Sequence, residues 1–359
     1  MHPVQKTRIG QLDALRAIAV TAVVFSHSIT QDTEIGSYAV YLFFVLSGYL
    51  ITGQLLALKA GVEPAMFSPG AVGGFYLRRA LRLFPAYYLA IIVAALLNID
   101  GMRQELPWHL VHASNLLFAL KPEFVESSWA GHFWSLSVEE QFYLLWPLVI
   151  FLLPVRWLGA AFAAVVLAGA YAWTPNNRIP DGVMALGFID SLDSLGIGAL
   201  LALAQWRGLR LSWLLPLGWA AAVLCGLLLV FQLLRPTLWP TAVSLALHEL
   251  MIFAFMALIS HAVAGIRGPG GAILNAPALQ YIGRISYGIY LFHPFINAVY
   301  WKASGKLGLA YFDYGLGLFA VVYIASVIAA GMSWEGLEKP ILRLQRKLAL
   351  RPAALGAAA

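Results

Sequence analysis

Residues 12–27, LDALRAIAVTAVVFSH, form an apolar stretch that carries two ionisable side chains, Arg16 and His27. An ionisable group at the centre of a membrane helix costs at least about 2.5 kcal/mol on insertion scales, so a chain that keeps two of them is expected to use them. The two residues are eleven positions apart, which in an α-helix gives a rise of about 16 Å and an angular separation of about 20°. The stretch therefore predicts a membrane helix with Arg16 and His27 on one face.

The composition places the whole chain among polytopic membrane proteins. Of its 359 residues, 61% are hydrophobic and 11% are charged, and the mean hydropathy is +0.77, which is far outside the usual range of soluble domains. The net charge of +6 comes from basic residues at the ends of apolar segments, which argues against a nucleic-acid surface. The single cysteine, Cys225, excludes an intrachain disulfide and a zinc site built on cysteines. We predict an all-α membrane helix bundle.

Ten apolar segments are long enough to cross a bilayer, at about 20 residues for each helix. They are residues 12–30, 38–58, 75–97, 132–153, 155–174, 185–206, 212–234, 241–264, 281–301 and 311–334. A further amphipathic segment, residues 108–120, is too short to span comfortably. We expect this segment to form an interfacial or re-entrant helix within an external loop at 98–131.

The distribution of basic residues predicts the orientation of the bundle. If segment 108–120 does not cross and the N-terminus is cytoplasmic, 17 of the 23 Lys and Arg residues lie on or near the inner side, as the positive-inside rule favours. Both termini are then cytoplasmic. We accordingly predict a transmembrane domain at residues 1–340 and a basic, then Ala-rich, cytoplasmic tail at residues 341–359.

Three arginines cluster in FYLRRALRLFP, residues 75–85, at the predicted inner start of the third helix. Arg79 and Arg82 are at i and i+3 and share a helix face, with Arg78 beside them. Guanidinium groups bind phosphate oxygens in a bidentate manner, so the cluster is a candidate site for an anionic ligand. The alternative is that these arginines contact lipid phosphates and fix the topology.

Two carboxylates, Glu139 and Glu140, enter the apolar segment HFWSLSVEEQFYLLWP at residues 132–147. If one of them lies near His27, it would orient the imidazole and stabilise its charge, as a general base requires. An interhelical salt bridge to an arginine is the alternative reading of the carboxylates. For the first helix, the alternative is that Arg16 snorkels to the headgroups and His27 is a hydrogen-bonded interior histidine.

Further ionisable residues recur at similar depth in other segments: Asp190, Asp193, His248, Glu249 and His293. The chain contains no Gly-rich phosphate loop, no HExxH zinc motif and no G-x-S-x-G elbow, so hydrolase and nucleotide-triphosphatase functions have no support. We therefore expect no metal cofactor.

Taken in order along the chain, these motifs make the sequence similar to the acyltransferase-3 family of integral membrane O-acyltransferases. The matching blocks are LDALRAIAVTAVVFSH, FFVLSGYLIT, RRALRLFPAYY, FWSLSVEEQFYLLWP, IDSLGIGALLA, ISYGIYLFHP and WEGLEKP. The resemblance implies transfer of an acyl group, usually acetyl from acetyl-CoA, to a hydroxyl of a carbohydrate or related acceptor. Because the chain ends soon after the last span, it resembles the stand-alone members that lack a fused extracellular esterase-like domain. A separate extracytoplasmic partner would then complete transfer to the acceptor.

The resemblance also assigns roles to residues. His27 matches the essential histidine of the family, Arg16 its paired basic residue, and Arg79 and Arg82 the Arg-x-x-Arg pair associated with the CoA donor. We expect Arg78 to assist these arginines. We expect His27, oriented by Glu139 or Glu140, to act as general base towards the acceptor hydroxyl. Four further residues are expected to contact the acceptor or support the site: Ser47, Trp134, Asp193 and His293.

Two alternative functions belong to classes of protein other than enzymes. A proton- or anion-coupled transporter or flippase would use the same intramembrane ionisable residues as a pathway, although the sequence shows no internal repeat. A scaffold that only binds partners in the membrane would not depend on His27. The expected location is a multi-pass protein of the bacterial cytoplasmic membrane. The acceptor is not specified by the sequence, and acetyl rather than a longer acyl group is what the family implies.

Overall fold

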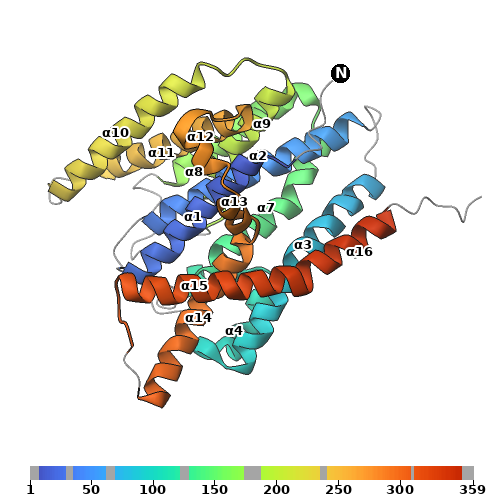
Figure 1. Ribbon diagram of the computed structural model, residues 1–359. Coiled ribbons are helices and arrows are strands. Elements are labelled where there is room, and N and C mark those ends of the chain that lie inside the picture. The colour runs from blue at the N-terminus through green and yellow to red at the C-terminus, as the bar shows by residue number, and fades with distance from the viewer. Residues whose placement is uncertain are drawn as a thin grey trace, which may run out of the picture.

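Figure 1 shows the computed structural model of the chain, which describes residues 8–29, 35–61, 69–121, 129–173, 187–234, 241–308 and 311–349. All regular structure in these ranges is helical. The last ten residues of the predicted Ala-rich tail, 350–359, lie outside the described residues. The predicted boundary between residues 340 and 341 falls within α16 (Lys339–Ala349). The predicted all-α fold is confirmed.

Eight helices of the described residues are long and apolar enough to cross a membrane. They are α1 (Gly10–Ile29), α2 (Ile35–Ala60), α3 (Pro69–Leu96), α7 (Phe133–Leu152), α8 (Val155–Ala172), α10 (Leu214–Leu234), α11 (Thr241–Ala264) and α15 (Leu316–Ser333). Each coincides with one of the predicted spans. A π-helical turn, Trp334–Glu338, joins α15 to α16 without a break.

The other two predicted spans differ from these eight. α9 (Leu192–Trp206) has 15 residues, so it is only about 22 Å long and shorter than a bilayer core of about 30 Å. α14 (Ser286–Leu307) has 22 residues, but polar side chains such as His293 and Lys302 lower its hydropathy. Its predicted start at residue 281 is wrong, because residues Pro277–Arg284 form a separate short helix, α13. The crossing of α9 and α14 stays a prediction.

The segment between α3 and α7 folds into short helices. A 3-10 turn at Ile99–Gly101 precedes α4 (Met102–Leu110) and α5 (Ser114–Leu120). The single helix predicted at 108–120 is therefore wrong. The helix is interrupted at His112, whose φ of 53° is left-handed and incompatible with a continuous right-handed helix.

α1 and α2 lie at the centre of the bundle (Figure 1), where α1 contacts α13, α14 and α15 while α2 contacts α7, α9 and α11. Glycines allow a close approach between α2 and α9. A Cβ atom on Gly48 would lie 2.0 Å from the Leu195 carbonyl oxygen, and one on Gly198 would lie 2.2 Å from that of Val45. Small residues at helix interfaces are the usual means by which membrane helices pack backbone to backbone. The remaining face of α2 is left to form the wall of a cavity with α1, α3 and α7.

Candidate active site

A cavity of about 80 Å³ lies between helices that are distant in the sequence. Its lining combines arginine, carboxylate and hydroxyl groups with aromatic rings, and comes from α1, α2, α3, α7, α13 and α14. The polar lining residues are Arg16, Ser47, Arg79, Arg82, Ser135, Glu139, Tyr143, Arg284, Ser286, Tyr287 and Tyr290. Such a concave site with a few convergent polar groups is the usual form of a small-molecule site.

Four arginines from three helices line this cavity. Arg79 and Arg82 are one helical turn apart on α3 and both face it, whereas Arg78 is exposed and does not line it. Arg16 enters from α1, with a guanidinium nitrogen 3.8 Å from the Asp13 carboxylate. Arg284, the last residue of α13, is exposed and therefore lies at the mouth. Four guanidinium groups against the one lining carboxylate, Glu139, make the cavity strongly attractive to anions.

Glu139 is tied to the cavity wall by a chain of hydrogen bonds between α2 and α7. The Ser47 hydroxyl donates to Glu139 Oε1 over 2.5 Å, and the Tyr143 hydroxyl donates to Ser47 Oγ over 3.1 Å. The Arg79 guanidinium lies over the Tyr143 ring, 4.5 Å from its centre, a cation–π geometry. Glu140, although adjacent in sequence, is not part of the cavity lining.

Two hydroxyls of the cavity lining lie one helical turn from a group of histidines. Ser135 Oγ and Tyr290 Oη lie 2.6 Å apart, and both line the cavity. One turn away along the two helices are His132 and His293, whose ring centres are 5.6 Å apart. The Ser135–Tyr290 pair therefore lies between the arginines of the cavity and the histidines.

His27 belongs to this histidine group. Its Nδ1 lies 2.9 Å from Nε2 of His293, and Nδ1 of His293 lies 2.7 Å from the backbone carbonyl oxygen of Tyr290. His293 is 1% exposed, whereas the His27 ring is accessible. Arg16 and His27 are thus at opposite ends of α1, one in the arginine-lined cavity and one in the histidine pair.

These contacts fix the tautomers of both neutral rings. A carbonyl oxygen only accepts, so His293 carries its proton on Nδ1 and presents an unprotonated Nε2. His27 must then donate from Nδ1 to His293. This leaves the lone pair on Nε2 of His27 free to accept a proton, which is the tautomer that a general base requires.

The expected support of His27 by Glu139 or Glu140 differs from this arrangement. Within the described ranges, the hydrogen bond of His27 goes to His293 and not to either carboxylate. The reason is depth, because Glu139 lies seven residues beyond His132 on α7, about 10 Å along the helix axis. The glutamate is therefore level with Arg79 rather than with the histidines.

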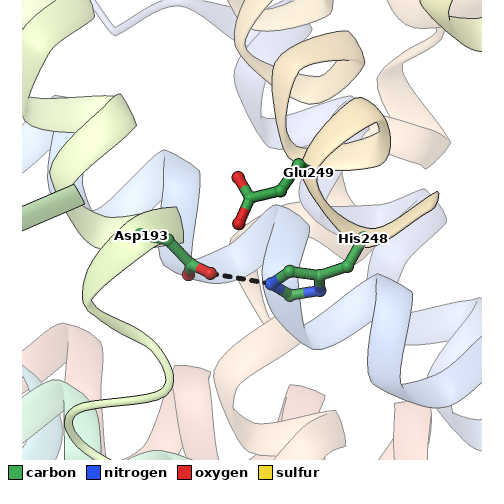
Figure 2. A group of neighbouring side chains, drawn as sticks. All are labelled: Asp193, His248 and Glu249. Carbon is green, nitrogen blue, oxygen red and sulfur yellow. Dashed lines mark hydrogen bonds and ion pairs between the residues drawn. The ribbon is translucent and has the colours of Figure 1, made fainter. Parts of the chain in front are cut away.

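Trp134 and Asp193 are placed elsewhere. Trp134 packs against the Phe44 ring, with the centres 5.9 Å apart, and does not line the cavity. Asp193 accepts a hydrogen bond of 2.8 Å from His248 (Figure 2) and has no contact with His27 in the part of the chain that the structure describes. Neither residue joins the two clusters of the candidate site.

Several residues of the site were not predicted from the sequence. They are His132, Ser135, Tyr143, Arg284, Tyr287 and Tyr290. Three of them lie close in sequence to predicted site residues, which could have identified them. His132 begins the segment that contains Glu139, and Tyr287 and Tyr290 precede His293 by two turns or less. In the sequence alone, Arg284 is one of the basic residues on the predicted inner side and carries no further signal.

Comparisons with known proteins support a family assignment. The family model described as an acyltransferase domain matches residues 9–331. A Staphylococcus aureus (strain COL) protein, provisionally named an O-acetyltransferase, is 26% identical over 92% of this chain and 57% of its own length. The peptidoglycan O-acetyltransferase OatA of Listeria monocytogenes is 29% identical over 79% of this chain and 49% of its own.

A third relative has the same extent as this chain. Nodulation protein 10 of Rhizobium leguminosarum bv. viciae is 25% identical over 95% of both chains. By contrast, this chain spans little more than half the length of the Staphylococcus relative and about half of OatA. No solved structure matches the chain.

Proposed function

Because this chain belongs to the acyltransferase-3 family, we propose that it is a membrane O-acetyltransferase that moves an acetyl group from acetyl-CoA to a glycan hydroxyl. The observation that carries the proposal is the pairing of two sites along α1. At one end Arg16 faces a cavity lined by four arginines, and at the other His27 presents a free Nε2. An anionic donor and a deprotonation step are the two requirements of this reaction.

The arginine-lined cavity suits the donor. CoA carries phosphate groups at one end of a long pantetheine arm, and guanidinium groups bind phosphates with charge-assisted hydrogen bonds. With the phosphates at Arg79, Arg82 and Arg284, the arm extends past Ser135 and Tyr290 towards His27. Its reach of roughly 15 to 20 Å is comparable to the rise of about 16 Å between Arg16 and His27 on α1.

His27 then performs the proton transfer. The acceptor hydroxyl donates its proton to Nε2 as its oxygen attacks the thioester carbonyl. The C–S bond then breaks, and the His27 imidazolium returns the proton to the leaving thiolate, so that CoA is released as its thiol. The His293 imidazole, hydrogen-bonded to Nδ1 of His27, holds the ring in place and stabilises the imidazolium. The acetyl ester and the free thiol account for all the atoms of the two substrates.

We infer the orientation of the chain in the membrane from the distribution of its basic residues. We place the arginine-lined cavity on the cytoplasmic side of a bacterial membrane, where acetyl-CoA is made, and His27 towards the outer side, with both termini inside. The glycan is the proposed acceptor because OatA is named for peptidoglycan O-acetylation. A separate extracytoplasmic protein that passes the acetyl group to its final acceptor is compatible with this route.

Binding and transport measurements test the proposal together. Purified protein in lipid nanodiscs should bind acetyl-CoA, and Arg82→Ala should weaken the binding while the exposed Arg78→Ala changes it much less. The same protein in proteoliposomes should move no sugar or anion in the absence of acetyl-CoA. Absence of acetyl-CoA binding together with solute transport would instead establish the transporter alternative.

A further inference from the structure

A second group of buried ionisable side chains lies apart from the candidate active site. Asp193, at the start of α9, faces His248 and Glu249 on α11 (Figure 2). Asp193 is 0% exposed and His248 is 2% exposed. The His248 Nε2 atom lies 2.8 Å from Asp193 Oδ2. None of the three residues lines the arginine-rich cavity.

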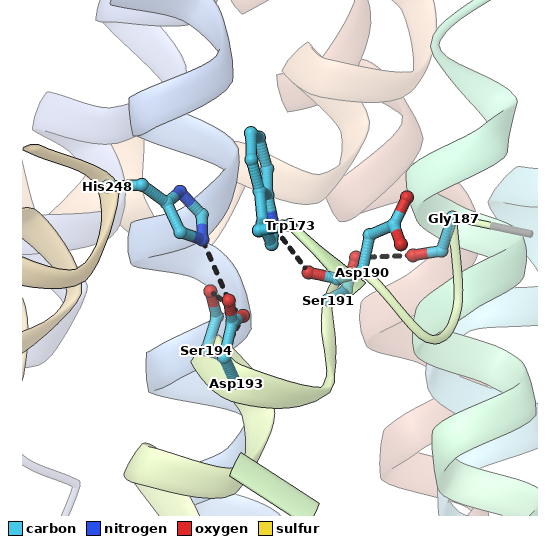
Figure 3. Close-up of polar contacts among 7 residues, drawn as sticks. All are labelled: Trp173, Gly187, Asp190, Ser191, Asp193, Ser194 and His248. Carbon is cyan, nitrogen blue, oxygen red and sulfur yellow. Dashed lines mark hydrogen bonds and ion pairs between the residues drawn. The ribbon is translucent and has the colours of Figure 1, made fainter. Parts of the chain in front are cut away.

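The three side chains converge on one point. One ligand atom from each, a carboxylate oxygen or an imidazole nitrogen, lies within 4.8 Å of the others. Asp193 is held in position because Oδ1 accepts from the backbone amide and the hydroxyl of Ser194, which leaves Oδ2 directed at His248 (Figure 3). The aspartate is therefore preorganised by its own helix.

The His248 ring is fixed as well. It stacks on the Trp173 indole with ring centres 4.0 Å apart and meets the Tyr41 ring edge-on at 4.6 Å. The indole is itself anchored, since Trp173 Nε1 donates to the backbone oxygen of Asp190 over 2.9 Å (Figure 3). Aromatic walls that hold an imidazole also keep water away from its ligand nitrogen.

The group has two carboxylates and one imidazole. Two carboxylates lie together, and in the described residues neither forms an ion pair with Lys or Arg. Glu249 Oε1 is buried and has no hydrogen-bond partner there. A buried carboxylate without a partner is costly in a nonpolar surrounding, and a bound cation removes that cost.

We propose that Asp193, His248 and Glu249 bind a divalent transition-metal cation of the zinc class. Imidazole nitrogen and carboxylate oxygen are both ligands that zinc accepts, and three protein ligands leave one position for water. Ligand atoms around tetrahedral zinc lie about 3.3 Å apart, so a rotation of the half-buried Glu249 side chain closes the site. The ion would join α9 to α11.

The expectation that the chain holds no metal rested on sequence motifs. Asp193 and His248 are 55 residues apart, and no short spacing motif connects them. Their proximity is a product of the packing of α9 against α11 and cannot be read from either segment alone. The proposed metal site is also independent of the proposed acetyl transfer, because it does not touch the cavity or His27.

Metal content of the purified chain tests this site directly. The full chain, purified without a His-tag, is stripped with EDTA, incubated with ZnCl₂, desalted and measured by mass spectrometry. We expect about one zinc per chain for the wild type, and a zinc affinity at least ~10-fold weaker for Glu249→Gln and His248→Gln. Glu249→Gln keeps the size of the side chain, so it removes a ligand without opening a cavity.

Matched control variants distinguish zinc binding at this site from zinc binding by other side chains of the chain. His261→Gln changes another histidine of α11, and Cys225→Ser removes the one thiol, so both should keep the wild-type zinc content. Thermal unfolding should shift upwards with ZnCl₂ in the wild type and not in a monodisperse Glu249→Gln variant. A wild type that retains no zinc, or a Glu249→Gln variant that retains as much as the wild type, would overturn the proposal and leave only a His248–Asp193 ion pair.

Discussion

Nδ1 of His27 lies 2.9 Å from Nε2 of His293, across 266 residues of sequence. Nδ1 of His293 donates a hydrogen bond to the backbone oxygen of Tyr290 over 2.7 Å, so Nε2 of His293 is unprotonated and accepts from Nδ1 of His27. The lone pair on Nε2 of His27 is therefore free. In this arrangement one histidine orients another, which is the role usually given to a carboxylate.

The role of His293 as a positioning residue predicts a graded set of variants. His27→Gln should lower kcat by about 10²- to 10⁴-fold, since it removes the general base. His293→Ala should lower kcat with little change in KM for acetyl-CoA. His293→Gln should retain more activity than His293→Ala, because the Gln oxygen reaches the position of Nε2 and accepts from His27. Steady-state kinetics and pH–rate profiles check this, and equal losses for both His293 variants would contradict it.

The arginines of the cavity should act on donor binding. Arg284→Ala removes a guanidinium that the sequence did not single out, and losing a charge-assisted hydrogen bond of about 1.5–3 kcal/mol raises Kd for acetyl-CoA about 10- to 150-fold. The difference between wild type and variant should shrink at high salt. Isothermal titration in nanodiscs measures both effects. Arg78→Ala is the matched control, and an equal effect there would mean that the cavity does not bind the donor.

The close packing of α2 on α9 predicts opposite effects for two glycines of one helix. Gly48→Ala places a Cβ 2.0 Å from the Leu195 carbonyl oxygen and should lower the free energy of unfolding by about 1–3 kcal/mol. Gly53→Ala meets no atom within 4 Å and should be neutral or stabilising by up to about 1 kcal/mol. Thermal unfolding of both variants in nanodiscs checks the sign. Similar melting temperatures would contradict the α2–α9 geometry.

Two histidines outside the membrane spans predict a dependence of stability on pH. Burial lowers the pKa of His109 and of His112 to about 4, from a reference value near 6.5. The unfolded chain therefore binds protons first, so stability is full above about pH 6.5 and falls as the pH drops towards 4. Melting temperatures between pH 7.5 and 4.5 should show this decline. His112→Asn, which tolerates a left-handed φ, should reduce the slope, and an unchanged slope would exclude His112 as a cause.

The sequence predicted local features of this protein better than long-range ones. Helical periodicity placed Arg79 and Arg82 on one face, and the same periodicity puts Arg78 about 100° away from Arg79, where the structure shows it exposed. The eleven-residue interval in α1 similarly related Arg16 to His27. Each of these inferences concerns residues of a single helix, and the geometry of a helix is set by hydrogen bonds within its own segment.

The partners of these residues depend on packing between helices. His293 and Arg284 reach the site from α14 and α13, and no local pattern in α1 or α3 specifies which helix will lie opposite. Glu139 or Glu140 was expected to orient His27, which requires the carboxylate and the imidazole to lie at the same depth in the membrane. Glu139 lies about two helical turns from His132, which neighbours the His27–His293 pair. A depth difference of that size, about 10 Å, is below what span boundaries inferred from hydropathy can resolve.

The role of His27 is tested by acceptor-dependent release of thiol from acetyl-CoA by the purified protein in nanodiscs, with oligosaccharides of chitin and peptidoglycan fragments as acceptors. We expect release by the wild type that rises with acceptor concentration and that falls by about 10²- to 10⁴-fold in His27→Gln, while acetyl-CoA binding by that variant is unchanged. Acceptor-dependent release by His27→Gln at a rate close to that of the wild type would contradict the assignment of His27 as general base.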